Sequence, residues 1–108
     1  MSFGIITVTE LKAKQEAGEK FRLIDVREPL EFNIARIPGA ELRPLGQIPQ
    51  WAQQLPDKDE EIVLHCHHGM RSARACEYLS RLGFTKLKNL TGGIAAWSQQ
   101  IDPSVPQY

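Results

Sequence analysis

The 108-residue sequence predicts an α/β protein built on a mainly parallel central sheet that helices cover on both faces. Short apolar runs rich in strand-forming residues alternate with segments whose apolar residues recur at helical spacing. Two of the runs, 21–26 and 62–65, consist largely of apolar residues, as is typical of strands buried on both faces of a parallel sheet. The length fits one domain with its own hydrophobic core.

The first half of the chain is expected to hold three strands and three helices. In chain order, the strands fall at 5–8, 21–26 and 41–42, and the helices at 10–16, at 29–35 and from 44 onward. Thr9 is expected to cap the first helix and Gly18 to end it. Pro29 suits a first helical position. An apolar stripe between 48 and 55 predicts the third helix, which the interior Pro49 shortens or bends.

The second half predicts two more strands and two more helices. The strands fall at 62–65 and 86–90, and the helices at 72–82 and 94–100. The first of these helices has the clearest apolar face, and Gly83 ends it. Pro103 and Pro106 predict a frayed end. We therefore expect a domain over 1–101 and a short C-terminal tail over 102–108.

Composition narrows the classes of function. Acidic and basic residues balance at 13 each, so no broad field attracts nucleic acid or an anionic membrane. The first residues contain neither a basic segment nor a long apolar stretch, which argues against a secretory signal or a membrane span. The two cysteines do not resemble a disulfide framework. The expectation is a cytoplasmic monomer with reduced thiols.

The segment from Cys66 to Arg71 is the most informative part of the chain. It lies between a predicted strand and a predicted helix, where free backbone N–H groups and the helix dipole favour a thiolate. Arg71 adds a fixed positive charge, and all three histidines lie beside Cys66. The arrangement suits a cysteine that attacks, or carries, an anionic group.

Four motifs in this order give the chain its resemblance to the single-domain rhodaneses, a family of sulfurtransferases. They are Leu23–Glu28, Ile37–Ala40, Cys66–Ser72 and Leu90–Trp97. The resemblance implies a doubly wound, mainly parallel sheet flanked by helices. It also implies that Cys66 takes a sulfane sulfur from a donor such as thiosulfate, holds it as a persulfide, and passes it to cyanide or a thiol. No cofactor and no metal are implied.

The resemblance also assigns roles within the loop. Cys66 is the catalytic residue, and the substrate-binding residues are the six that follow it: His67, His68, Gly69, Met70, Arg71 and Ser72. Their backbone N–H groups are expected to surround the sulfur, much as an oxyanion hole surrounds an oxygen. Arg71 is expected to bind the donor and fix the loop rather than only to pair with a surface carboxylate. His67 and His68 should line the pocket mouth rather than act as acid and base.

Other residues are expected to be structural. His65 should end its strand with its side chain held by a hydrogen bond. Asp25, Arg27 and Glu28 resemble a family cluster that caps and pairs within the scaffold. Gly69 should permit a backbone angle that other residues resist. Cys76 should be a small, half-buried side chain.

Rival interpretations remain at this point. The first is a sulfur-carrier or protein-binding module with little turnover. His67 stands where many family members have a basic residue, and a neutral imidazole offers less field to an anionic donor such as thiosulfate. The second is a phosphatase or arsenate reductase, disfavoured because four residues rather than five separate Cys66 from Arg71. A zinc site is disfavoured because adjacent residues cannot wrap a tetrahedral ion. The expected partners are small sulfur donors and a thiol or sulfur-relay protein as acceptor.

Overall fold

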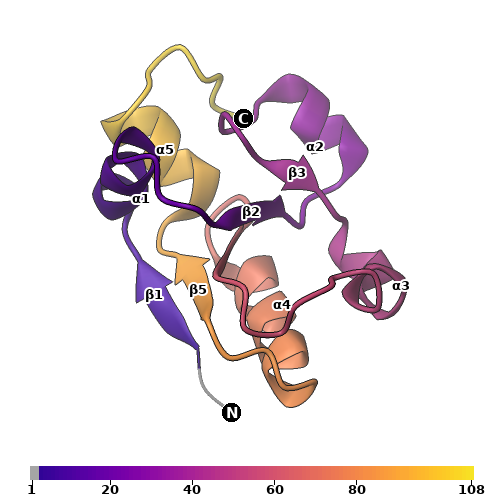
Figure 1. The fold of residues 1–108 in the computed structure, drawn as a ribbon. Helices are drawn as coiled ribbons and strands as arrows, with labels where there is room; N and C mark the ends of the chain where they lie inside the picture. Colours follow the sequence, from indigo (N-terminus) through magenta and orange to yellow (C-terminus); the bar gives the residue numbers. More distant parts are fainter. Residues whose placement is uncertain (1–2) are drawn as a thin grey trace.

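A computed structural model describes residues 3–108, and within them five strands form one parallel sheet of order β1-β5-β4-β2-β3 (Figure 1). The strands are β1 (Gly4–Ile6), β2 (Arg22–Asp25), β3 (Glu41–Leu42), β4 (Ile62–His65) and β5 (Leu87–Leu90). Every pairing between neighbours is parallel. The predicted α/β class is therefore confirmed, and β4 lies at the centre of the sheet between β2 and β5.

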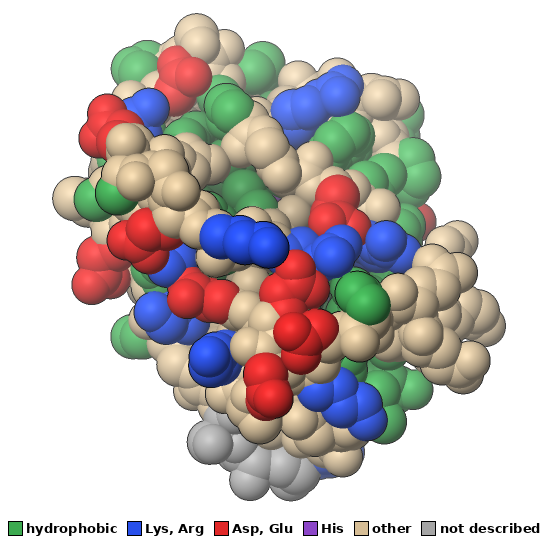
Figure 2. Space-filling model, viewed as in Figure 1, with side chains coloured by type: hydrophobic (Ala, Val, Ile, Leu, Met, Phe, Trp, Pro, Cys, Tyr) green, Lys and Arg blue, Asp and Glu red, His purple; other side chains and the backbone are tan. Residues whose placement is uncertain are grey.

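Helices cover both faces of this sheet (Figure 1). They are α1 (Val8–Glu16), α2 (Pro29–Ile34), α3 (Ile48–Ala52), α4 (Met70–Arg81) and α5 (Gly93–Gln100), with a 3-10 turn, η1 (Leu45–Gln47), before α3. No helix in the described part of the chain is long and apolar enough to cross a membrane. Acidic and basic side chains intermix over the face in Figure 2, as the balanced charge predicts.

The side chains of β4 alternate between two apolar cores. Ile62 and Leu64 join the core beneath α3 and α4, whereas Val63 joins the core beneath α1 and α5. Trp51 belongs to the first core and Trp97 to the second. Both faces of the central strand are thus buried, which explains why its residues form an apolar run.

The first helix begins two residues earlier than predicted. Thr7, not Thr9, is the N-cap: its hydroxyl accepts the Glu10 N–H at 3.1 Å, and the Glu10 carboxylate accepts the Thr7 N–H at 2.9 Å. This reciprocal pair requires a glutamate or glutamine three residues after the cap. Thr9 has Lys12 at that position, so only Thr7 can form the pair.

The fourth helix also begins two residues early, at Met70 rather than Ser72. Gly69 is its N-cap, with a φ of 119° that a side chain would resist. The chain therefore turns from the loop directly into α4. Met70, Arg71 and Ser72 form the first helical turn, where backbone N–H groups have no partner within the helix.

The prediction of a frayed tail over 102–108 is wrong. Val105 is buried in the core beneath α1 and α5, and the hydroxyl of Ser98 donates to its carbonyl at 2.5 Å. The prolines Pro103 and Pro106 prevent a helix, but they do not prevent this packing. The tail consequently returns towards the sheet and places Tyr108 beside α2 and the cysteine loop.

Candidate active site

Cys66 directly follows β4, at the carboxyl edge of the sheet where α/β proteins bind ligands. The start of α5 fixes the backbone there: the carbonyls of Cys66 and His67 accept the N–H groups of Ile94 at 3.0 Å and Ala95 at 3.1 Å. Gly93 permits this contact, because a Cβ at that position would overlap both carbonyl oxygens. The fourth motif, Leu90–Trp97, therefore holds the backbone of the cysteine loop in place.

Polar groups of the loop and of α4 surround the sulfur of Cys66, whose residue is 1% exposed. Its Sγ accepts the Gly69 N–H at 3.1 Å and lies 3.4 Å from the Ser72 hydroxyl. Burial by itself raises the pKa of the Cys66 thiol, but hydrogen bonds from Ser72, Gly69 and the backbone of Arg71 outweigh it. The pKa is lowered, so the site favours a thiolate.

Asn89, in β5, positions the donors around the sulfur. Its Nδ2 donates to the carbonyl of Gly69 at 3.0 Å, and its Oδ1 accepts the Ser72 hydroxyl at 2.5 Å. The amide thus connects the turn of the loop with the first turn of α4. Sequence analysis missed Asn89, although a polar residue near the carboxyl end of a predicted strand, beside a glycine turn, was a usable signal.

Arg71 pairs with Glu31 of α2. From the sequence, such pairing with a carboxylate was the less favoured role of Arg71, after binding of the donor. Two hydrogen bonds of 2.7 and 2.9 Å join the guanidinium to both carboxylate oxygens. They are the largest cause of the low pKa of Glu31, about 2, and in return they raise the pKa of Arg71. Glu31 was not predicted from the sequence as a site residue.

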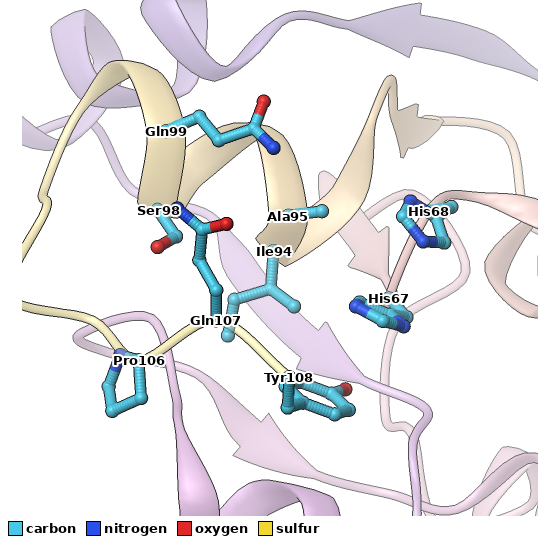
Figure 3. A pocket seen from close by; sticks show the side chains of 9 residues that line it. All are labelled: His67, His68, Ile94, Ala95, Ser98, Gln99, Pro106, Gln107 and Tyr108. Carbon is cyan, nitrogen blue, oxygen red and sulfur yellow. The ribbon is translucent and has the colours of Figure 1, made fainter.

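The two histidines after the cysteine form an aromatic stack with Tyr108. The ring centroids of His67 and His68 lie 4.1 Å apart, and those of His67 and Tyr108 lie 4.2 Å apart. The three rings border a cavity of about 150 Å³ between α5 and the tail (Figure 3). Burial, followed by the charge of His68, lowers the pKa of His67, which favours a neutral ring at neutral pH.

Asp25 and Arg27 form a buried ion pair at the carboxyl end of β2. The Arg27 guanidinium donates to Asp25 at 2.6 Å, and both side chains are fully buried. Further bonds run from Arg27 to the carbonyl of Ala35 at 2.6 Å and to the hydroxyl of Tyr108 at 2.7 Å. These contacts tie β2 to the end of α2 and to the tail, which confirms the scaffold interpretation of the pair.

His65 ends β4, as predicted, but its expected hydrogen bond is absent. Neither ring nitrogen has a hydrogen-bond partner among residues 3–108, and Nε2 lies 3.8 Å from Oδ2 of Asp25. Burial is the largest influence on the ring and lowers its pKa, so it is neutral at neutral pH. The side chain is fully enclosed at the centre of the sheet, beside Asp25.

Met70 and Cys76, both on α4, differ in burial. The side chain of Met70 points into solvent, with the residue 76% exposed. Cys76 is fully buried rather than half-buried, and burial raises the pKa of its thiol to about 12. A protonated, enclosed thiol is a poor nucleophile, whereas the pKa of Cys66 is lowered. Among residues 3–108, no group of three His, Cys, Asp or Glu side chains is arranged to hold a metal ion.

The fold and loop define a rhodanese-like domain, and comparison with known proteins shows the same. The Rhodanese-like domain family matches residues 7–100, so the chain belongs to that family. A sulfurtransferase of Allochromatium vinosum is 39% identical over 87 residues, which cover 81% of this chain and 80% of that protein.

A solved structure and the longer relatives agree with this assignment. The rhodanese-like domain protein of Staphylococcus aureus superposes with a TM-score of 0.81 at 35% identity, covering 88% of this chain and 91% of that one. Rhodanese-like/PpiC domain-containing protein 12 of Arabidopsis thaliana is 40% identical over 111 residues, covering 95% of this chain. The chain spans only 26% to 36% of the length of that protein and of two other curated relatives.

Proposed function

We propose that the protein is a sulfurtransferase that carries a sulfane sulfur as a persulfide on Cys66. The observation that carries the proposal is the environment of Sγ: a buried sulfur with a lowered pKa that accepts the Gly69 N–H at 3.1 Å. Such donors stabilise a thiolate before transfer. After transfer, they are placed to stabilise the negative charge of the persulfide.

The first half-reaction loads the enzyme. The Cys66 thiolate attacks the outer sulfur of a donor such as thiosulfate, a new S–S bond forms, and the donor's S–S bond breaks with its electron pair leaving on sulfite. The charge is conserved, because a thiolate and a dianion become a persulfide anion and a dianion. No general acid is needed, so His67 and His68 need not transfer a proton.

The second half-reaction transfers the outer sulfur from Cys66 to an acceptor. Cyanide, or the thiolate of an acceptor, attacks the outer sulfur of the persulfide, and the electron pair of the S–S bond returns to Cys66. Thiocyanate or an acceptor persulfide leaves. A small thiol or a sulfur-relay protein is the acceptor class we propose, with the protein acting as a monomer in the cytoplasm without metal or organic cofactor.

Intact-protein mass spectrometry tests the proposal. After incubation with thiosulfate, the protein should gain one sulfur, about 32 Da, which cyanide removes with release of thiocyanate. The Cys66→Ser variant should gain nothing, while Cys76→Ser should behave as the parent. A parent that gains no sulfur from thiosulfate, an organic persulfide or polysulfide would contradict the proposal.

The restricted access to Cys66 favours a second candidate, a sulfur-carrier or binding module with little turnover. Cys66 is only 1% exposed, and the guanidinium of Arg71 is already bound to Glu31. Both features hinder rapid exchange with a small anionic donor. Stoichiometric loading without multiple turnovers, in the presence of excess donor and cyanide, would identify a carrier.

A further inference from the structure

Tyr108 connects the tail to the cysteine loop, to Arg27 and to α2 through three contacts. Its ring stacks on His67 with an interplanar angle of 9° (Figure 3). Its hydroxyl accepts from Nη1 of Arg27 at 2.7 Å and donates to Oε2 of Glu31 at 2.9 Å. Burial raises the pKa of Tyr108, so the phenol keeps the proton that it donates to Glu31 at neutral pH.

The hydroxyl bridges two ion pairs whose charges cancel. One pair is Asp25 with Arg27, and the other is Glu31 with Arg71. Nη1 of Arg27 is occupied by the phenol, and both terminal nitrogens of Arg71 are occupied by Glu31. An anionic donor that approaches the loop therefore meets a neutral cluster. The Arg27 guanidinium is fully buried, and to bind the partly exposed guanidinium of Arg71 the donor must displace Glu31, which already accepts its hydrogen bonds.

The carboxylate of Glu31 is itself held from several sides. It accepts the N–H of Glu28 at 3.1 Å as well as the bonds from Arg71 and Tyr108. The phenol is the contact supplied by the tail, and its loss would loosen Glu31 in its pair with Arg71. Removal of this one hydroxyl therefore makes the guanidinium of Arg71 more available to an anion, whereas Arg27 stays buried.

We propose that Tyr108 and Glu31 set the charge of the sulfur donor, with Tyr108 as the positioning residue. Glu31 occupies Arg71 and Tyr108 holds Glu31 in place, and together they direct Cys66 to sulfane donors of at most one negative charge, such as thiosulfonates and organic persulfides, in preference to the thiosulfate dianion. The inference rests on the proposed function and specifies its substrate class.

The chemical step is the same for the two donor charges, which permits a direct comparison. With methanethiosulfonate, the Cys66 thiolate attacks the terminal sulfur, the Sγ–S bond forms, and the donor's S–S bond breaks with its electron pair leaving as methanesulfinate. Two monoanions become two monoanions. Thiosulfate differs in its second charge and in sulfite as the leaving group, so the comparison between variants isolates the binding of that charge.

The test is the ratio of kcat/KM for thiosulfate to kcat/KM for methanethiosulfonate, measured by thiocyanate release at saturating cyanide. Tyr108→Phe keeps the ring and removes the hydroxyl. We expect it to lower KM for thiosulfate about threefold to tenfold while changing KM for methanethiosulfonate less than about twofold. Glu31→Gln should shift the ratio further in the same direction, because it removes one negative charge from the cluster.

The matched control is Tyr78→Phe, which removes the chain's other phenol hydroxyl, on α4, and should leave the ratio unchanged. An unchanged ratio in Tyr108→Phe and Glu31→Gln would overturn the inference, as would an equal loss of activity towards both donors. If circular dichroism shows that Tyr108→Phe or Glu31→Gln does not fold, the ratio measured for the other variant tests the inference. A wild-type protein that transfers sulfur from neither donor would overturn the proposed function itself.

Discussion

The hydroxyl oxygen of Ser72 lies 3.4 Å from the sulfur of Cys66. The same oxygen lies 2.5 Å from Oδ1 of Asn89 and 3.2 Å from the carbonyl of Gly69. A hydroxyl has one proton, so it can donate to only one of these three acceptors at a time. When Cys66 ionises, its sulfur becomes the charged acceptor and should draw that proton.

Ser72→Ala should therefore raise the pKa of Cys66. A hydrogen bond to a charged group contributes roughly 1.5–3 kcal/mol, and its loss corresponds to a shift of about one pH unit or more. The rate of alkylation by iodoacetamide, followed against pH in a Cys76→Ser background, measures the shift. Ser72→Thr restores the hydroxyl and should restore most of the profile, whereas identical profiles for Ser72→Ala and the parent would contradict this role.

Gly93→Ala should destabilise the protein by about 2 kcal/mol or more. A Cβ at this position would overlap the carbonyls of Cys66 and His67, and its φ of 57° disfavours a side chain as well. Urea unfolding gives the loss of free energy. Gly46→Ala is the matched control, because a Cβ there has no atom within 4 Å, and it should change the stability by less than about 1 kcal/mol. Equal stabilities of the two variants would exclude the overlap as a constraint.

Periodicity and turn residues were enough to predict a mainly parallel sheet and the succession of strands and helices along the chain, but not the order of the strands within the sheet. The errors fall at helix starts and in the tail. Thr7 and Thr9 have the same capping chemistry, and only the identity of the residue three positions later separates them. The buried position of Val105 depends on a core formed by distant segments, so local composition wrongly predicted a frayed end.

The residues of the site show the same difference between local signals and contacts that are distant in sequence. Cys66 could be predicted because its strand–loop–helix context is local in sequence. Glu31 and Tyr108 could not, since their partners lie 40 and 77 or more positions away and nothing near them in sequence indicates the contact. Asn89 lies between these cases, because its strand was predicted but the side chains facing it were not.

The pairing of Glu31 should make the protein sensitive to acid. The pKa of Glu31 is about 2 in the folded protein, below its ordinary value of 4.5. A lowered carboxyl pKa contributes stability that is fully present above the unfolded value and is lost as the pH falls from about 4.5 towards 2. Unfolding free energies of the parent and Glu31→Gln should therefore differ at pH 7, and most of the difference should be lost by about pH 2. A constant difference over this range would contradict the assigned pairing.

The buried pair of Asp25 and Arg27 leads to a prediction about stability. Arg27→Met removes the cation but leaves Asp25 fully buried with an uncompensated charge, which should cost about 3–5 kcal/mol. The double variant Asp25→Asn with Arg27→Met also removes the stranded charge, so it should recover part of that loss. Chemical denaturation of the parent, both single variants and the double variant measures the coupling between them. If the losses of the two single variants simply add, the two residues do not stabilise the fold as a pair.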